Sequence, residues 1–249
     1  MSRFTLCQTV WHRRPISYLA SIVLLCACPP AFGADELLSM GEQWKYSDSG
    51  TAPDESWTQS NFDDKQWKSG QAPLGYGDSH IKHQVSFGGD ADAKHITTYF
   101  RRTVDVQNPS AAKKFLVKLL CDDGCVAYLN GNEILRYNMP DGEIKNDLTS
   151  AQTAQGSAEQ HRFSFLVDTD KLKAGTNTIA ARVHQRSQGS SDLAFDFSLK
   201  ALTTDDEVEQ AKQAQYADKR VAQSASGGFT RQPPRSKRPQ RSVRPELEG

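Results

Sequence analysis

The chain has 249 residues, of which 37% are hydrophobic and 24% are charged, and its 30 basic and 30 acidic residues give a formal net charge of zero. This composition excludes a membrane-spanning bundle, a collagen and a wholly disordered chain. The length allows one sizeable domain, or one domain with tails. Residues 34–202 hold 18 basic and 23 acidic residues, so charge argues against nucleic-acid binding by the main body of the chain.

The first 33 residues have the pattern of a signal peptide. A basic segment without acidic residues is followed by a short apolar run over 16–27 and by the small-residue pattern Ala31-Phe32-Gly33. The apolar run is shorter than the ~20 residues of a membrane-spanning helix. We therefore expect a signal peptide over 1–33, cleaved before Ala34, and an exported protein that is secreted or resides in the periplasm or cell envelope. The alternative is a lipoprotein signal, because residues 25–28 half-resemble a lipobox.

Short strands separated by turn signals follow. Asn130-Gly131 is a strong hairpin signal, and no helix-period stretch longer than two turns occurs before residue 203. The pattern predicts an all-β fold, an antiparallel β-sandwich or barrel. Alternating or continuous apolar residues mark the expected strands at 43–46, 97–106, 115–120, 126–129, 133–137, 161–167, 177–183 and 193–199.

Two cysteines follow the predicted signal peptide, Cys121 and Cys125, and they flank Asp122-Asp123-Gly124. This tripeptide is typical of a three-residue hairpin loop with glycine in the left-handed position. Residues opposite each other on a hairpin have disulfide-compatible spacing, so we predict a disulfide in an oxidising compartment. A metal or redox pair is the alternative, although no histidine lies nearby.

The character of the chain changes at residue 203. Thr204 and Glu207 have capping-box spacing, which predicts a helix that ends near residue 222. Because its apolar positions are small, we expect a solvated helix with little packing. The composition from Ser224 onward is rich in Ser, Gly, Pro, Gln and Arg. Residues 203–249 are therefore predicted to be a short helix and a disordered basic Pro/Arg-rich tail.

Four motifs occur in order between residues 40 and 202, and they are Phe62-Asp63-Asp64 with Trp67, Tyr99-Phe100-Arg101-Arg102-Thr103, Asp122-Asp123-Gly124 with Tyr128-Leu129-Asn130-Gly131, and Ala174-Gly175-Thr176-Asn177 with the strand over 179–183. Together they resemble a galactose-binding-like jelly roll, the sugar-binding domain of β-galactosidase- and β-glucuronidase-type glycoside hydrolases and an accessory module of secreted bacterial proteins. The resemblance implies one such β-sandwich domain over 34–202 and a carbohydrate partner. No catalytic barrel or phosphoesterase domain follows in the given sequence, so we do not expect the hydrolase activity of that family here.

Residues suited to catalysis are present without a catalytic arrangement. Asp78, His80, His83 and His95 share one loop-rich segment, but the His80–His83 spacing suits a metal only on a helix, so we expect a polar surface loop and no metal or other cofactor. Asp122 and Asp123 suit a turn, and a structural Ca²⁺ is left open because two adjacent aspartates do not establish one. A triad could be composed from His184, Ser191 and Asp192, but no nucleophile elbow is present. The sequence predicts that the protein is not an enzyme.

Polar residues at strand ends are the predicted ligand contacts. The strand after Asn130-Gly131 ends before Met139-Pro140, and the strand over 177–183 runs into His184. If these ends lie at the same rim of the sandwich, their side chains converge and can bind sugar hydroxyls. Further candidates are Tyr76, Tyr99, Arg101, Tyr137 and Arg186. The predicted ligand-binding residues are Arg136, Asn138, His184, Gln185 and Asp192.

The sequence as a whole predicts an exported, non-catalytic module that binds a carbohydrate or cell-surface glycan. The alternatives are a structural or protein–protein interaction module of the bacterial envelope, and an accessory subunit of a hydrolase or metallophosphoesterase. We expect no specific nucleic-acid partner and no transmembrane segment. The basic tail is a second predicted contact, for an anionic polymer. Its basic residues are interleaved with prolines and are Arg231, Arg235, Lys237, Arg238, Arg241 and Arg244.

Overall fold

The computed structural model describes residues 36–153 and 159–225. The predicted signal peptide over 1–33 and the predicted tail beyond residue 225 lie outside these residues. Within the described ranges, no helix has both the length and the apolar character that crossing a membrane requires.

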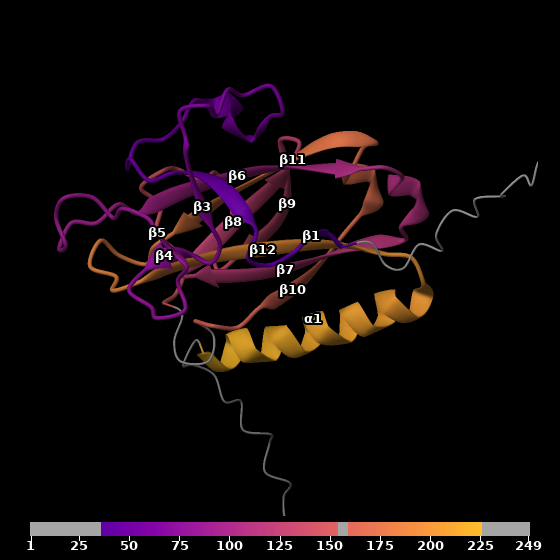
Figure 1. The fold of residues 1–249 in the computed structure, drawn as a ribbon. Helices are drawn as coiled ribbons and strands as arrows, with labels where there is room; N and C mark the ends of the chain where they lie inside the picture. Colours follow the sequence, from indigo (N-terminus) through magenta and orange to yellow (C-terminus); the bar gives the residue numbers. More distant parts are fainter. Residues whose placement is uncertain (1–35, 154–158, 226–249) are drawn as a thin grey trace, which may run out of the picture. The chain divides into compact units, whose positions relative to one another are not determined.

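Two six-stranded sheets form the fold (Figure 1). The first, called here the β12 sheet, has the order β10-β7-β12-β4-β5, with β1 also paired to β12, and the second, the β11 sheet, has the order β3-β2-β6-β11-β8-β9. All strand pairs are antiparallel except β4 with β5. The predicted all-β antiparallel sandwich is confirmed. The strands are β1 (Glu36–Leu38), β2 (Gln43–Ser47), β3 (Lys68–Gln71), β4 (Leu74–Tyr76), β5 (His83–Gln84), β6 (Thr97–Val106), β7 (Lys114–Asp122), β8 (Gly124–Leu129), β9 (Asn132–Tyr137), β10 (Phe163–Val167), β11 (Gly175–His184) and β12 (Leu193–Leu202).

The core lies between the two sheets and is built from alternate residues of each strand. Phe195 of β12 is fully buried; the ring of Phe100 from β6 stacks on it at 4.1 Å between centroids, and Trp44 from β2 meets it edge-on at 5.0 Å. Burying each of these side chains contributes roughly 1.5–3 kcal/mol. Because side chains alternate along a strand, the residues between these core positions lie on the outer faces of the two sheets.

The motif that contains Phe62 and Asp64 contacts the motif that contains Arg101 on the outer face of the β11 sheet. Arg101 is 2% exposed, and its guanidinium donates to Asp64 Oδ2 at 3.0 Å, to the carbonyl of Gln59 at 3.2 Å and to the carbonyl of Trp57. The ring of Phe62 lies 5.0 Å from the guanidinium. Phe62 and Trp67 pack in a small apolar cluster on this outer face, and the guanidinium of Arg101 is engaged by protein partners.

The segment Asp122-Asp123-Gly124 does not close a hairpin, which corrects the prediction. β7 pairs with β10 and β12, whereas β8 pairs with β9 and β11, so the chain crosses here from one sheet to the other. The same turn residues suit any sharp change of direction, and the sequence does not distinguish a hairpin from a crossing. Cys121 and Cys125 are buried free thiols in this structure, so the disulfide is not present in it and stays a prediction.

The helix α1 (Asp205–Ala225) starts where the capping box predicts. Glu207 N donates to Thr204 Oγ1 at 3.2 Å, and Thr204 N donates to Glu207 Oε2 at 3.2 Å. The helix is longer than predicted, and the expectation of little packing is wrong, because α1 lies along the edge strand β10 (Figure 1). Asp218 accepts a 2.7 Å hydrogen bond from the backbone N–H of Ser164 in β10. This contact occupies a donor that an uncovered sheet edge would leave unpaired.

Candidate functional site

Four of the five predicted ligand residues lie together at one end of the sandwich. Asn138 Nδ2 donates to the carbonyl of Asp123 at 3.0 Å, and Gln185 Nε2 donates to the carbonyl of Asp192 at 2.8 Å. The backbone of His184 pairs with the first residue of β8, directly after Asp123. The ends of β9 and β11 and the start of β12 therefore lie close together, as expected from the sequence.

These side chains support loops and present little surface to a ligand. His184 and Gln185 are 0% exposed. His184 Nδ1 lies 2.7 Å from the carbonyl oxygen of Leu148, and burial lowers the pKa of His184 to about 4. The amide of Asn138 is engaged on both atoms with the backbone of Gln152, at 2.6 and 3.1 Å. Their contact with a ligand stays a prediction, and in this structure His184 and Asn138 hold the loop between β9 and β10 in place.

Arg136 lies on the outer face of the β11 sheet, as His184 does, because Tyr137 and Val183 are the adjacent residues that reach the core. There the guanidinium of Arg136 donates to both oxygens of Glu133, at 2.9 and 2.7 Å, and to the carbonyls of Pro140 and Gly142. Its hydrogen bonds are to residues other than the four, so a shared rim stays a prediction.

Three carboxyl groups gather beside the crossing between the sheets. Burial, together with the charges of Asp123 and Asp192, raises the pKa of Asp122 to about 9, so Asp122 is protonated at neutral pH and shares a hydrogen bond with Asp123. Burial and the same carboxyl groups raise the pKa of Tyr76, whose hydroxyl has no hydrogen-bond partner among the described residues. No three His, Cys, Asp or Glu side chains in 36–153 and 159–225 are arranged to hold a metal ion.

The histidines of the segment 73–95 do not converge. The His83 ring lies 2.9 Å from the hydroxyl of Tyr46, and His95 Nδ1 lies 3.1 Å from the carbonyl of Asp48. His80 faces Asp78 at 3.8 Å. Each imidazole therefore has its own neighbour, and the segment offers no shared catalytic or metal centre.

An open groove crosses the outer face of the β12 sheet and has a volume of about 530 Å³. On β12, Phe197 and Leu199 point into the core, so Ser198 and Lys200 point outward. Their partners on β7 are Lys118 and Leu116. We call this hollow the β12 groove. Its lining residues come from β1 and the turn after it, from β7, from the start of β10 and from β12, and they are Glu36, Ser39, Met40, Leu116, Lys118, Arg162, Ser198 and Lys200.

A buried carboxylate fixes one wall of the groove. Asp196 is 1% exposed, and both its oxygens accept hydrogen bonds from the backbone N–H of Gly41, at 3.1 and 2.9 Å. Asp196 Oδ1 also accepts from Phe197 N at 2.8 Å. Gly41 has φ +81°, a conformation that glycine adopts without strain. This anchor holds the turn that contributes Ser39 and Met40.

Charge is unevenly distributed in the β12 groove. Lys118, Arg162 and Lys200 contribute three cations, and Glu36 is the one carboxylate of the lining. Within the described part of the chain, neither Lys118 nor Arg162 forms an ion pair. Sequence reasoning missed this site because it followed the apolar residues of the two strands. The polar residues at every second position, Lys118, Ser198 and Lys200, were the available signal.

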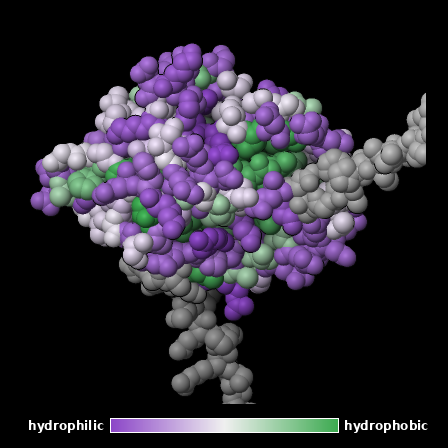
Figure 2. Space-filling model, viewed as in Figure 1, coloured by the Kyte–Doolittle hydropathy of each residue, from purple (hydrophilic) through white to green (hydrophobic). Residues whose placement is uncertain are grey.

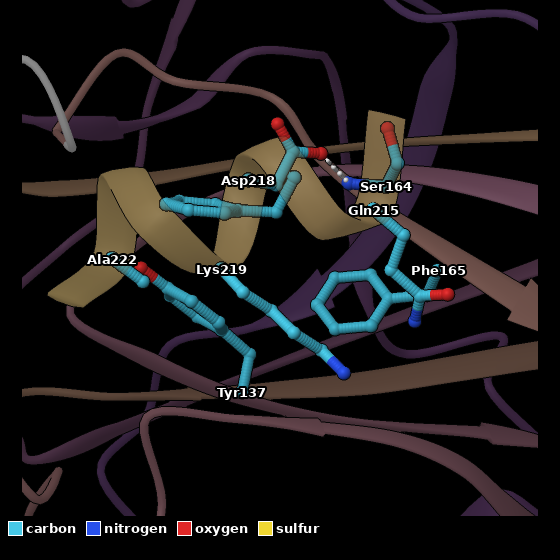
Figure 3. Close-up of a pocket in the computed structure, with 8 residues that line it drawn as sticks. Tyr137, Ser164, Phe165, Gln215, Asp218, Lys219 and Ala222 are labelled. Carbon is cyan, nitrogen blue, oxygen red and sulfur yellow. Dashed lines mark hydrogen bonds between the residues drawn. The ribbon is translucent and has the colours of Figure 1, made fainter. Parts of the chain in front are cut away.

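A second hollow lies between α1 and β10 and measures about 90 Å³. Figure 3 shows Tyr137, Phe165 and the aliphatic chain of Lys219 around it, with Asp218 bonded to Ser164 at its side. Small-molecule sites usually have roughly 300–1,000 Å³. This hollow is a gap in the contact between helix and sheet, and the β12 groove is the better candidate site.

No protein-family model and no curated protein matches the chain. Among solved structures, the chain is similar to a β-glycosidase from Bacteroides vulgatus, with 18% identity over 66% of this chain and 20% of that chain and a TM-score of 0.42. It is also similar to a calcium-binding mutant of β-glucuronidase 2 from Bacteroides uniformis, with 17% identity over 68% of this chain and 18% of that chain and a TM-score of 0.43. A β-glucuronidase from an uncultured Clostridium species gives 14% identity over 69% and 30% of the two chains and a TM-score of 0.41. The similarity thus covers a minor part of each of those proteins.

Proposed function

We propose that this protein is an exported, non-catalytic carbohydrate-binding module and that the β12 groove is its binding surface. One observation carries the proposal: the groove of about 530 Å³ combines aliphatic, hydroxyl and charged side chains on one face of a sheet. A sugar presents C–H faces, which pack on aliphatic side chains, and hydroxyl groups, which need donors and acceptors. Met40 and Leu116 supply the first kind of contact, and Ser39, Ser198 and Glu36 supply the second.

The exposed surface favours a glycan over a protein partner. Surfaces that bind proteins present contiguous apolar patches. Among the described residues, Tyr216 on α1 is the one large hydrophobic side chain that is exposed. Figure 2 shows that hydrophilic residues cover most of the visible face, with hydrophobic residues in smaller areas between them.

The lining of the groove suits binding without hydrolysis. Glycoside hydrolysis ordinarily needs two carboxyl groups on either side of the scissile bond. Glu36 is the single carboxylate in the lining of the groove. The groups that remain can hold a saccharide, and they offer no second acid to cleave it.

A glycan array probed with the full-length chain tests the proposal. In a second step, Leu116→Trp fills the floor of the groove, and Leu148→Trp makes the same change at a half-buried leucine outside it. We expect the full-length chain to bind a defined set of glycans and Leu116→Trp to weaken that binding at least tenfold, with Leu148→Trp unaffected. Failure to bind any glycan, or equal binding by a folded Leu116→Trp variant, would contradict the proposal.

A further inference from the structure

We infer that the β12 groove selects a saccharide with anionic substituents, sulfate esters or carboxylates, which lie against Lys118, Arg162 and Lys200. This inference rests on the proposed function and adds the class of ligand. It is carried by the placement of the three cations, by the absence of an ion-pair partner for Lys118 among the described residues and by the neutral residues between the cations.

The pairing of the strands brings the three cations to one place. Lys118 on β7 lies directly opposite Ser198 on β12, and Lys200 follows Ser198 by two residues on the same face. On the other side of β7, Ser164 of β10 pairs with Lys118, and Arg162 precedes Ser164 by two residues. The three cations therefore lie on neighbouring strand segments next to two buried serines, Ser164 and Ser198, in a region where backbone hydrogen bonds fix the register.

The three cations differ in the acids that the described residues place near them. Lys200 Nζ lies 3.5 Å from Glu207 Oε1, but the other oxygen of Glu207 accepts the backbone N–H groups of Thr203 and Thr204 at the start of α1, at 2.9 and 3.2 Å. The buried Asp196 attracts Arg162 at longer range and is already bonded to the backbone. Lys118 has no ion-pair or hydrogen-bond partner among the residues described.

The lining of the groove and the domain as a whole differ in the balance of basic and acidic residues. Residues 34–202 carry more acidic than basic residues, 23 against 18. The lining of the groove holds three cations and one carboxylate, with Glu207 and Asp196 as acids outside the lining, so Lys118 is the cation without an acidic partner in the described residues. A cation exposed in a cleft attracts anions and speeds their arrival. Charge-assisted hydrogen bonds from lysine and arginine to sulfate or carboxylate oxygens are stronger than bonds between neutral groups.

The neutral lining argues for a saccharide in place of a bare anion. Met40 and Leu116 are aliphatic, and Ser39 and Ser198 are hydroxyl residues, within the same hollow of about 530 Å³. An inorganic ion would leave most of this volume and these side chains unused. A sugar ring that carries a charged group uses both the cations and the neutral floor.

Calorimetric titration of the full-length chain tests the inference with matched ligands. The anionic probes are a galacturonic acid tetrasaccharide and a sulfated tetrasaccharide, and the neutral probe is the methyl ester of the galacturonic acid tetrasaccharide. The two anionic arms distinguish a carboxylate from a sulfate ester as the preferred group. We expect at least one anionic probe to bind ten times more tightly than the ester.

Two double variants separate the groove from general charge. Lys118→Ala/Arg162→Ala removes two cations of the groove, and Lys65→Ala/Lys212→Ala removes two lysines whose side chains are 81% and 57% exposed outside it. The first should weaken binding of the anionic probe at least tenfold and binding of the ester less than twofold, and the second should change neither. The basic residues of 231–244 are common to all proteins compared, so their contribution cancels.

The outcomes distinguish this inference from the proposed function. Equal affinity for the ester and the acid, or an equal loss in both double variants, overturns the inference and leaves carbohydrate binding in place. Binding to vesicles of anionic phospholipid without binding to either anionic oligosaccharide also overturns it. If no saccharide binds, neutral or anionic, the proposed function itself fails. Thermal melting of each variant confirms that the compared proteins are folded.

Discussion

Replacement of Asp122 by asparagine should remove a fall in stability between pH 6.5 and 8.5. The pKa of Asp122 is raised from 3.8 to about 9 by burial and by the charges of Asp123 and Asp192. Between these values the folded protein binds a proton that the unfolded chain has released. Stability is therefore greatest in acid and declines as pH rises through this window, by up to about 1.4 kcal/mol per pH unit.

A second buried group acts with the opposite sign at lower pH. Burial lowers the pKa of His184 from 6.5 to about 4. Between these values the unfolded chain binds a proton that the folded protein excludes, so stability rises with pH, also by up to about 1.4 kcal/mol per unit. The two effects offset each other below pH 6.5. Above it the contribution of Asp122 acts without that of His184, and two pH units correspond to about 2–3 kcal/mol.

Urea unfolding followed by tryptophan fluorescence, at pH 5.5, 6.5, 7.5 and 8.5, measures the effect. The asparagine of Asp122→Asn can still donate to Asp123, as the protonated acid does, and it cannot ionise. We expect the free energy of unfolding of the parent protein to fall above pH 6.5 and that of the variant to change much less. Parallel pH profiles for the two proteins would refute the assignment of a proton to Asp122 in the folded state.

Three further predictions concern the cysteines, the helix and the N-terminus. Cys121 and Cys125 are expected to be bridged in exported protein, and two freely alkylated thiols in mass spectra of native exported material would contradict this. Asp218→Ala should lower the free energy of unfolding by about 1–3 kcal/mol, because it leaves Ser164 N without its acceptor. Denaturant unfolding beside Glu209→Ala, an exposed change on the same helix, measures this, and equal stability of the two variants would show that α1 does not hold the edge of β10. N-terminal sequencing of exported protein should begin at Ala34, whereas a start at Met1 would exclude the predicted cleavage.

The fold was predictable because the signals that specify it are local. The alternation over residues 97–106 became β6, and the capping box at Thr204 became the start of α1. The crossing at Asp122-Asp123-Gly124 was mistaken for a hairpin, because its direction depends on which distant strands pair with β7 and β8. The packing of α1 was missed for a related reason. Its contact with β10 uses Asp218, a charged residue that a search for an apolar helix face passes over.

The site was harder to predict because exposure is a property of the assembled sheets. His184 and Gln185 were selected as polar residues at a strand end, yet the loop between β9 and β10 covers them and leaves them 0% exposed. Arg136 was placed with them by its position near the end of β9. Strand alternation puts both Arg136 and His184 on the outer face of the β11 sheet, since Tyr137 and Val183 are the residues that reach the core. Arg136 is bonded there to Glu133 and to the carbonyls of Pro140 and Gly142, which the sequence does not indicate. Position along a strand locates a residue at one end of the sandwich, and the parity of its position decides which face it occupies.

The same alternation of side chains explains why the β12 groove is lined by residues that form no recognisable sequence motif. Phe195, Phe197 and Leu199 fill the core, and the residues between them must therefore face outward. One of these, Asp196, accepts hydrogen bonds from Gly41 and has the structural role of anchoring its turn, whereas Ser198 and Lys200 line the β12 groove. Since Lys118 lies across from Ser198 on the neighbouring strand, sheet register rather than any sequence motif produces the cationic character of the groove.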